Sequence, residues 1–150
     1  MKSKVKITKS PEQAIKALEK LNKAMRGKES VKVGLPKGSN DYPDGTSVIM
    51  VGTVQEFGSP SRGIPQRSYL RSTIQEKRRP YKRMFARLAK QIIDGKIDKV
   101  QALGLVGLQV QTDVREKITD ISEPALVSRE GNPLVDTGHL RQSITFEVTS

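Results

Sequence analysis

Two groups of residues in this chain have types and spacing that suit chemistry, and the first is the tripeptide Asp136-Thr137-Gly138. It invites an aspartic-protease interpretation, in which two carboxylates, one from each lobe or subunit, share a proton. A homodimer would supply two copies of Asp136, but a protease lobe is almost all β-structure, whereas this chain has mostly helical periodicity. We therefore predict that the tripeptide fixes a turn, in which Asp136 or Thr137 caps the helical turn that follows.

Other residues that carry chemistry stand alone. His139 is the single His and the chain has no Cys, so one chain cannot form a multi-His or thiolate metal site. Ser143 lacks the Gly-x-Ser-x-Gly setting of a hydrolase nucleophile. Residues 34–38 lack the Lys-Ser/Thr ending of a phosphate-binding loop. We therefore predict that the chain is not an enzyme, and we expect no cofactor and no metal.

The second group is a basic stripe between residues 78 and 90, in a chain of net charge +11. Its cations could neutralise phosphates, and Tyr81 could stack on a base. The same cations would pack equally well against an acidic protein surface, and the sequence leaves both partners open. The cations are Arg78, Arg79, Lys82, Arg83, Arg87 and Lys90.

Composition indicates a single domain over residues 1–150 with a lean, aliphatic core. Only 35% of the residues are hydrophobic, and the chain has three Phe, three Tyr and no Trp. No apolar run approaches the roughly 20 residues that span a bilayer, and the first residues lack the apolar core of a signal peptide. We expect no membrane contact and synthesis in the cytoplasm.

Five helices are predicted from apolar residues at helical spacing. Ser10, Pro11 and Gln13 form a capping box that starts a helix ending near Gly27. Residues 48–57 fit a strand or a helix, and we prefer a helix that ends at Gly58. Helices are also expected over 69–77, from 81 to 93 with Phe85 and Leu88 facing the core, and after Asp98.

The helix after Asp98 has an apolar seam and two internal glycines, Gly104 and Gly107. Each glycine costs up to about 1 kcal/mol relative to Ala, so we expect both to allow close packing. The seam consists of Val100, Leu103, Val106, Val110, Val114 and Ile118.

Strands are expected over 4–8, 31–35 and 143–148, where apolar and polar residues alternate. The predicted fold class is therefore α+β, with a small, mainly antiparallel sheet packed against three or four helices and with long loops.

Two segments resemble the tail-completion, or head–tail joining, proteins of long-tailed bacteriophages. In the first, an amphipathic segment ends in a Glu-Phe-Gly-like tripeptide, and a loop leads to an Ile-Pro-x-Arg-x-Phe/Tyr-Leu-like stretch. The family often has His where this chain has Gln55, and Pro where it has Ser68, and neither position has an evident chemical duty. The matching residues are Glu56, Phe57, Gly58, Ile64, Pro65, Arg67, Tyr69 and Leu70.

The second segment resembles a Pro-Leu-x-Asp-Thr-Gly-x-Leu-x-x-Ser-Ile stretch that precedes a closing strand in the same family. The order and spacing of the two segments cover residues 31–148. No single motif is specific, and the ordered combination carries the resemblance. The matching residues are Pro133, Leu134, Asp136, Thr137, Gly138, Leu140, Ser143 and Ile144.

The resemblance implies a non-enzymatic virion protein at the head–tail junction, made in the host cytoplasm and assembled as a ring in the neck. Its implied partners are other neck and tail proteins, such as tail terminator or tube proteins and head-closure or connector proteins, with non-specific contact to DNA in the conduit. The eight residues of the first motif are candidate interface residues, although Phe57, Tyr69 and Leu70 also suit an ordinary core. The alternative is a small basic nucleic-acid-binding protein that uses the 78–90 stripe.

Overall fold

The computed structural model of the protein describes residues 10–124, 134 and 138–149, so the strand expected over 4–8 lies outside the described residues. The described part contains six α-helices and a two-stranded antiparallel sheet, which confirms the α+β class. A short 3₁₀-helix, η1, spans Pro60–Arg62. The elements are α1 (Pro11–Met25), β1 (Ser30–Gly34), α2 (Val48–Phe57), α3 (Leu70–Glu76), α4 (Arg78–Ile93), α5 (Lys99–Asp120), α6 (His139–Ser143) and β2 (Thr145–Thr149).

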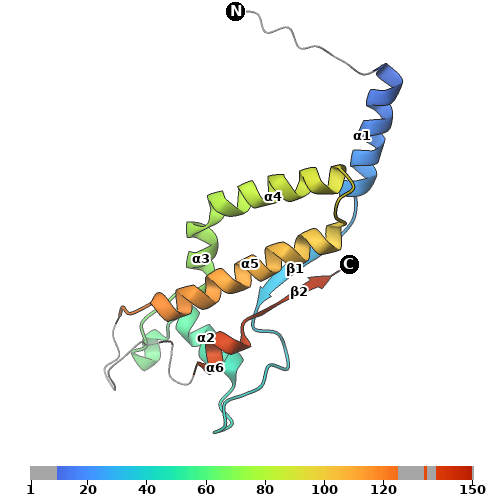
Figure 1. Cartoon of the computed structure of the whole chain (residues 1–150). Coiled ribbons are helices and arrows are strands. Elements are labelled where there is room, and N and C mark those ends of the chain that lie inside the picture. The colour runs from blue at the N-terminus through green and yellow to red at the C-terminus, as the bar shows by residue number, and fades with distance from the viewer. Residues whose placement is uncertain (1–9, 125–133, 135–137, 150) are drawn as a thin grey trace, which may run out of the picture.

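The sheet pairs β1 with β2, which are far apart in the sequence, and both strands lie beside the long helix α5 (Figure 1). Ser30 pairs with Thr149 and Gly34 pairs with Thr145. The strand expected over 143–148 thus begins at Thr145, because Ser143 still belongs to α6. α5 lies against both strands, while α3, α4 and α6 also contact α5. The sheet and these helices therefore share α5 as the centre of the fold.

Gly107 explains how the strands approach α5 so closely. A Cβ atom at this position would lie 2.4 Å from Cδ2 of Phe146 and 2.8 Å from a methyl group of Val31. The prediction of close packing is confirmed for Gly107. It is wrong for Gly104, where a Cβ atom would meet no other atom within 4 Å.

Local capping signals place the helix starts correctly. The Ser10 hydroxyl accepts from the backbone N–H of Gln13, and the Gln13 side chain accepts from the backbone N–H of Ser10. Asp98 and Gln101 form the same reciprocal pair at the start of α5. The preference for a helix over residues 48–57 is also confirmed, and Gly58 ends it with φ of 76°.

The prediction that a new helix starts near Tyr81 is wrong, because α4 begins three residues earlier. Lys77 both ends α3 and precedes α4, so the two helices are nearly continuous. Pro80 then sits in the first turn of α4, where backbone N–H groups have no intrahelical partner. The missing N–H of Pro80 therefore removes no helix hydrogen bond, and the preference against helical geometry at Arg79 is overcome.

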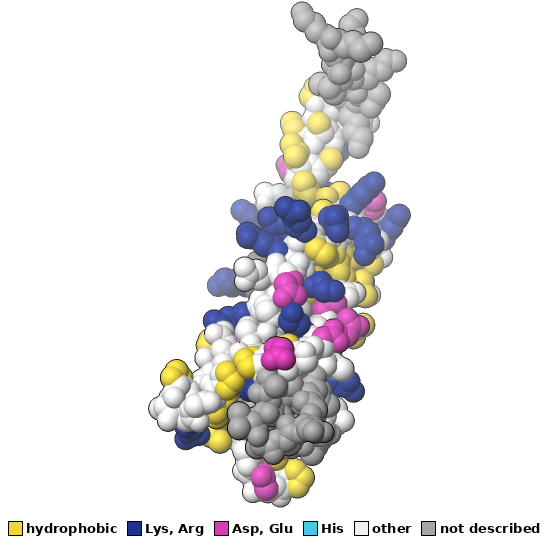
Figure 2. Space-filling view, turned by 90° about the vertical axis from the view of Figure 1, so that its left-hand side faces the viewer, with side chains coloured by type: hydrophobic (Ala, Val, Ile, Leu, Met, Phe, Trp, Pro, Cys, Tyr) yellow, Lys and Arg dark blue, Asp and Glu magenta, His cyan; other side chains and the backbone are white. Residues whose placement is uncertain are grey.

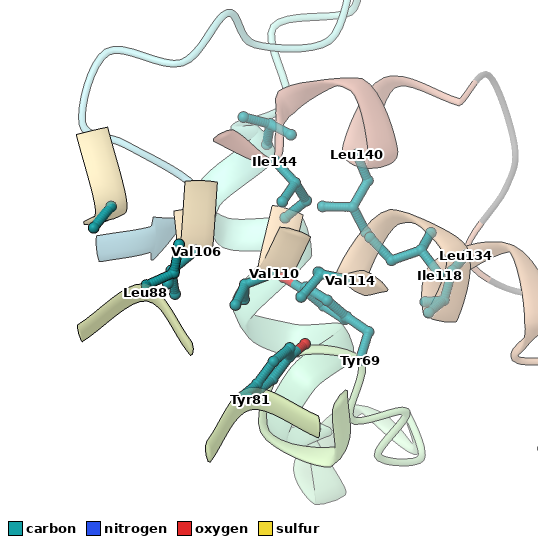
Figure 3. Packing of buried hydrophobic residues seen from close by; sticks show 12 residues of the cluster. Tyr69, Tyr81, Leu88, Val106, Val110, Val114, Ile118, Leu134, Leu140 and Ile144 are labelled. Carbon is teal, nitrogen blue, oxygen red and sulfur yellow. The ribbon is translucent and has the colours of Figure 1, made fainter. Parts of the chain in front are cut away.

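The core lies along one side of α5 (Figure 3). Val106, Val110, Val114 and Ile118 are buried as the apolar seam predicts, whereas Val100 at the start of the helix is exposed. Leu88 of α4 is also buried. Phe85 of α4 is not part of the core, because it remains 47% exposed, which corrects the expectation for this residue.

α1 stands apart from this core. It projects from the body at the end of α4 (Figure 1) and has no buried residue. Its side chains at helical spacing, Ile15, Leu18 and Met25, are each more than half exposed. The helix therefore presents an apolar side that the described part of the chain does not cover.

Candidate functional site

The first family-like motif folds into an internal clamp around the carboxylate of Glu56. Glu56 lies in the last turn of α2 and is only 4% exposed. Its Oε2 accepts hydrogen bonds from the backbone N–H groups of Tyr69 and Leu70, both at 2.8 Å. Its Oε1 accepts from the Ser68 hydroxyl at 2.7 Å, and from the backbone N–H and the Nε of Arg71 at 3.1 and 2.8 Å.

This clamp supplies the cap that α3 lacks. Tyr69, the residue before α3, makes no capping hydrogen bond with its side chain. A helix N-terminus leaves backbone N–H groups unpaired and favours a nearby anion. Burial by itself raises the pKa of the Glu56 carboxyl, but the hydrogen bonds from Leu70, Arg71 and Ser68 outweigh it and hold the pKa below its ordinary value. Glu56 is therefore an ionised, buried tie between α2 and α3.

The two positions at which this chain departs from the family pattern both take part in the clamp region. The Ser68 hydroxyl donates to Glu56, and the Gln55 side-chain carbonyl accepts from a guanidinium N–H of Arg67 at 3.3 Å. The interpretation that these positions have no chemical duty is therefore wrong. Both contacts join residues 12 apart in the sequence, so neither could be read from local spacing.

Arg67 and Tyr69 lie inside the chain as well. Arg67 is 4% exposed, and its Nε donates to the carbonyl of Pro124 at 2.8 Å. The hydroxyl of Tyr69, which is 3% exposed, donates to the carbonyl of Gly52 at 3.2 Å. A larger residue at position 52 would displace its neighbours, because a Cβ atom there would lie 2.3 Å from a methyl group of Leu35 and 2.8 Å from the Tyr69 oxygen.

Most residues of the motif thus stabilise the fold of their own chain, which corrects part of the predicted interface. Buried side chains with partners in their own chain cannot anchor another molecule in this conformation, and this applies to Glu56, Arg67 and Tyr69. Gly58, Ile64 and Leu70 are half-buried. Only Pro65 and Phe57 are exposed, and the Arg71 guanidinium lies over the Phe57 ring at 4.3 Å from its centroid.

The second motif is described only in part. Asp136 and Thr137 lie outside the described residues, so their predicted capping role stays a prediction. Gly138 precedes α6 in the left-handed conformation, with φ of 74°, which a glycine adopts without strain. Leu140 and Ile144 are core residues. His139 contributes a ring nitrogen to a hydrogen bond with the carbonyl of Asn40 at 2.7 Å.

The basic stripe is a continuous exposed surface along α4. Its six cations are all exposed, and none of them pairs with an acid among the residues that the structure describes. Figure 2 shows Lys and Arg side chains gathered below α1, next to exposed hydrophobic side chains. The six are Arg78, Arg79, Lys82, Arg83, Arg87 and Lys90.

Tyr81 does not belong to that surface, so the prediction that it stacks on a base is wrong. It is 8% exposed, and its hydroxyl donates to the carboxylate of Asp113 at 2.7 Å. Burial, followed by the hydrogen bond to Asp113, raises the pKa of the Tyr81 hydroxyl. Asp113 also accepts from Gln109 at 3.2 Å and lies 3.7 Å from Lys77. This buried group ties α4 to α5.

Metal binding and membrane insertion can be judged over the described residues. No three His, Asp or Glu side chains there come together as a metal ion would require. Within the same residues, no helix has the length and apolar character needed to cross a bilayer. Comparisons of the chain with protein-family models, curated proteins and solved structures found no match.

Proposed function

We propose that this chain is a structural virion protein at the head–tail junction of a tailed phage, where it completes the tail or joins it to the head. It acts as a subunit of a ring in the neck and binds other neck and tail proteins. It is made in the host cytoplasm and carries out no reaction. The support comes from the ordered resemblance of residues 31–148, together with one structural observation.

That observation is the apolar side of α1, which the described part of the chain leaves uncovered. Isolated helices of up to about 15 residues are marginal in water, and helices in proteins gain most of their stability by packing an apolar side. The 15-residue α1 buries none of its residues, and Leu18 is 64% exposed. A helix built in this way is completed by a neighbouring subunit or partner, as in a ring with head-to-tail contacts.

Deleting the gene from its phage tests the proposal. Electron microscopy should show filled heads and separate tails that fail to join, and mass spectrometry should find the protein in intact wild-type particles. Normal infectious particles from the deletion phage would overturn the proposal.

A matched pair of variants then tests α1 itself. Leu18→Glu should leave the thermal unfolding of the isolated protein unchanged, because the side chain is mostly exposed, yet it should fail to restore joined particles. Glu19→Gln, on an adjacent exposed position of the same helix, should restore them. Equal rescue by both variants would show that α1 is not an assembly surface.

The alternative is a nucleic-acid-binding protein, favoured by the cations of α4, which pair with no acid among the described residues. Six cations that each neutralise a phosphate give a slope of about −5 for log affinity against log salt on duplex DNA. Neutralising Arg78, Arg79, Lys82 and Arg83 together should reduce the steepness of that slope by about 4. Weak binding with little dependence on salt would remove this alternative.

A further inference from the structure

An apolar hollow opens beside the basic surface of α4. It has a volume of about 790 Å³ and is bounded by α3, α4, α5 and β1. Val106 and Val110 of α5 contribute to its lining, together with Phe85 of α4 and Ile74 of α3. Ile74 and Phe85 are 44% and 47% exposed, so this lining is open to solvent.

A second hollow of about 420 Å³ extends the first toward the end of α1. Both hollows are lined by Phe85 and Val106, and the second continues past Leu88 to Met25. We call the two together the α4 groove. It follows α4, whose 16 residues span about 24 Å. The groove therefore offers several helical turns of apolar contact.

The rim of the α4 groove is positively charged. Arg71, Arg78 and Lys82 line the larger hollow, whose lining contains no acid among the described residues. Arg71 is occupied by Glu56 at 2.8 Å, but Arg78 and Lys82 have no acidic partner in the described part of the chain. In the smaller hollow, Glu29 is already paired with Lys99 at 2.8 Å.

We propose that the α4 groove binds an acidic amphipathic helix of a partner protein. The apolar side of that helix packs on Phe85, Ile74 and Val106, and its carboxylates face Arg78 and Lys82. Helices laid into hydrophobic grooves are a recurring mode of recognition. Exposed ion pairs are each worth only about 0.2–1 kcal/mol, so the apolar contacts hold the helix while the cations orient it and speed its arrival.

The composition of the groove favours this occupant over two others. Nucleic acid would use the cations but would leave the aliphatic lining in water, since Tyr81 is buried and Phe85 is the only aromatic ring exposed there. A second copy would offer its α1, but that helix carries Lys16, Lys20 and Lys23 against two Glu residues. It would bring further positive charge to a positive rim.

This inference goes beyond the neck assignment and does not depend on it. Groove binding is measured on the purified protein, whereas the head–tail role is measured on particles. Either result can fail while the other stands.

The first test uses fluorescence anisotropy with a labelled peptide of about 18 residues, or five helical turns. The peptide carries Leu along one side of a helix and Glu elsewhere. One comparison peptide replaces Glu by Gln, and another has the same composition in an order that forms no apolar side. We expect saturable binding of the Leu/Glu peptide at least about tenfold tighter than of either comparison peptide. No saturable binding, or equal binding of all three peptides, would overturn the proposal.

Variants then locate the binding. Phe85→Ser should weaken the Leu/Glu peptide by about tenfold or more, since buried aromatic contacts dominate such interfaces. The double variant Arg78→Glu and Lys82→Glu should weaken it by a similar factor at low salt. Leu108→Ser is the matched control, because Leu108 is 54% exposed on α5 and lies outside the groove lining. Equal effects of Phe85→Ser and Leu108→Ser would refute the site.

Two further outcomes would assign the groove to another occupant and overturn the proposal. If duplex DNA displaces the peptide and loses affinity in the charge-reversal variant but not in Phe85→Ser, the surface is a nucleic-acid site. If sedimentation instead shows a self-associated chain that Phe85→Ser dissociates, the occupant is a second copy. We expect a monomeric protein whose groove binds the peptide and neither DNA nor a second copy.

Discussion

Replacing Glu56 by Gln is the sharpest perturbation of the clamp, because the two side chains have nearly the same size. The carboxylate of Glu56 accepts hydrogen bonds from Ser68, Tyr69, Leu70 and Arg71. An amide offers one oxygen and one NH₂ group, and the NH₂ group cannot accept any of these bonds. In either orientation of the amide, its NH₂ group faces hydrogen-bond donors that the carboxylate oxygen had accepted from.

The cost follows from which donors lose their acceptor. With the amide nitrogen at the Oε2 position, the N–H groups of Tyr69 and Leu70 are orphaned. At the Oε1 position, the Ser68 hydroxyl can rotate and accept, and the Nε of Arg71 can turn to water because its side chain is 53% exposed, so only the backbone N–H of Arg71 is orphaned. Each buried donor without an acceptor costs about 1–3 kcal/mol. The amide takes the second, cheaper orientation, and one orphaned donor predicts a loss of about 2 kcal/mol, or about 6 °C in Tm for a domain of this size.

The assay is thermal unfolding followed by circular dichroism, with Glu116→Gln as the control. Glu116 is an exposed carboxylate on α5, so its replacement should change stability by less than about 0.5 kcal/mol. A loss for Glu56→Gln no larger than for Glu116→Gln would refute the clamp as a stabilising element.

The pH dependence of stability, compared between wild type and Glu56→Gln, separates the effect of charge from that of shape. The pKa of Glu56 is lower in the folded chain than in the unfolded chain, so the unfolded chain binds more protons in acid. The stability from the ionised clamp is therefore complete above the unfolded pKa of about 4.3, and it is lost as the pH falls through the folded value. The difference in free energy of unfolding between wild type and Glu56→Gln should become smaller in that pH range. If this difference stays constant as the pH falls, the charge of Glu56 contributes nothing to stability.

Three other predictions concern α4 and α5, each measured by urea or thermal unfolding. Gly107→Ala should destabilise the protein by about 2 kcal/mol through overpacking against Phe146, whereas Gly104→Ala should stabilise it by up to about 1 kcal/mol; the same sign for both would contradict the packing. Arg83→Glu turns like-charge pairs with Arg79 and Arg87, one helical turn away, into attractive ones. It should therefore stabilise the protein by about 1 kcal/mol at low salt and by little at 1 M salt; a loss of stability at low salt would refute repulsion along α4. Tyr81→Phe removes a donor from buried Asp113 and should cost about 1–2 kcal/mol, and a neutral result would mean that Gln109 and Lys77 suffice.

Much of the fold could be predicted from the sequence because its signals are local. The capping boxes at Ser10 and Asp98 each lie within four residues, and the buried side of α5 repeats at helical spacing. The same periodicity misjudged Phe85, which has the spacing of a core residue but opens onto the groove. Periodicity identifies which side of a helix is apolar, and only the tertiary arrangement decides whether that side is covered.

The clamp shows what sequence reasoning cannot reach. A carboxylate is rarely buried, so composition alone assigns Glu56 to the surface. Its partners lie 12 to 15 residues away across a loop, and no periodic pattern links them. Tyr69 before α3 makes no capping bond with its side chain, and the Ser68 hydroxyl accepts only from the N–H of Ser72. A distant group must therefore accept from the N–H groups of Tyr69, Leu70 and Arg71.

The separation between the clamp and the exposed surfaces decides how the proposals should be tested. Residues of the family-like motif hold α2 to α3, so substitutions at Glu56 or Tyr69 impair any function through loss of stability. Leu18 and Phe85 are exposed, and their replacement should leave the fold intact. If a variant of either residue blocks particle joining or peptide binding at unchanged Tm, the effect belongs to the surface. If a variant loses function only when Tm falls, the side that it alters, which the described residues leave uncovered, has no partner, and the proposal that rests on that side loses its physical basis.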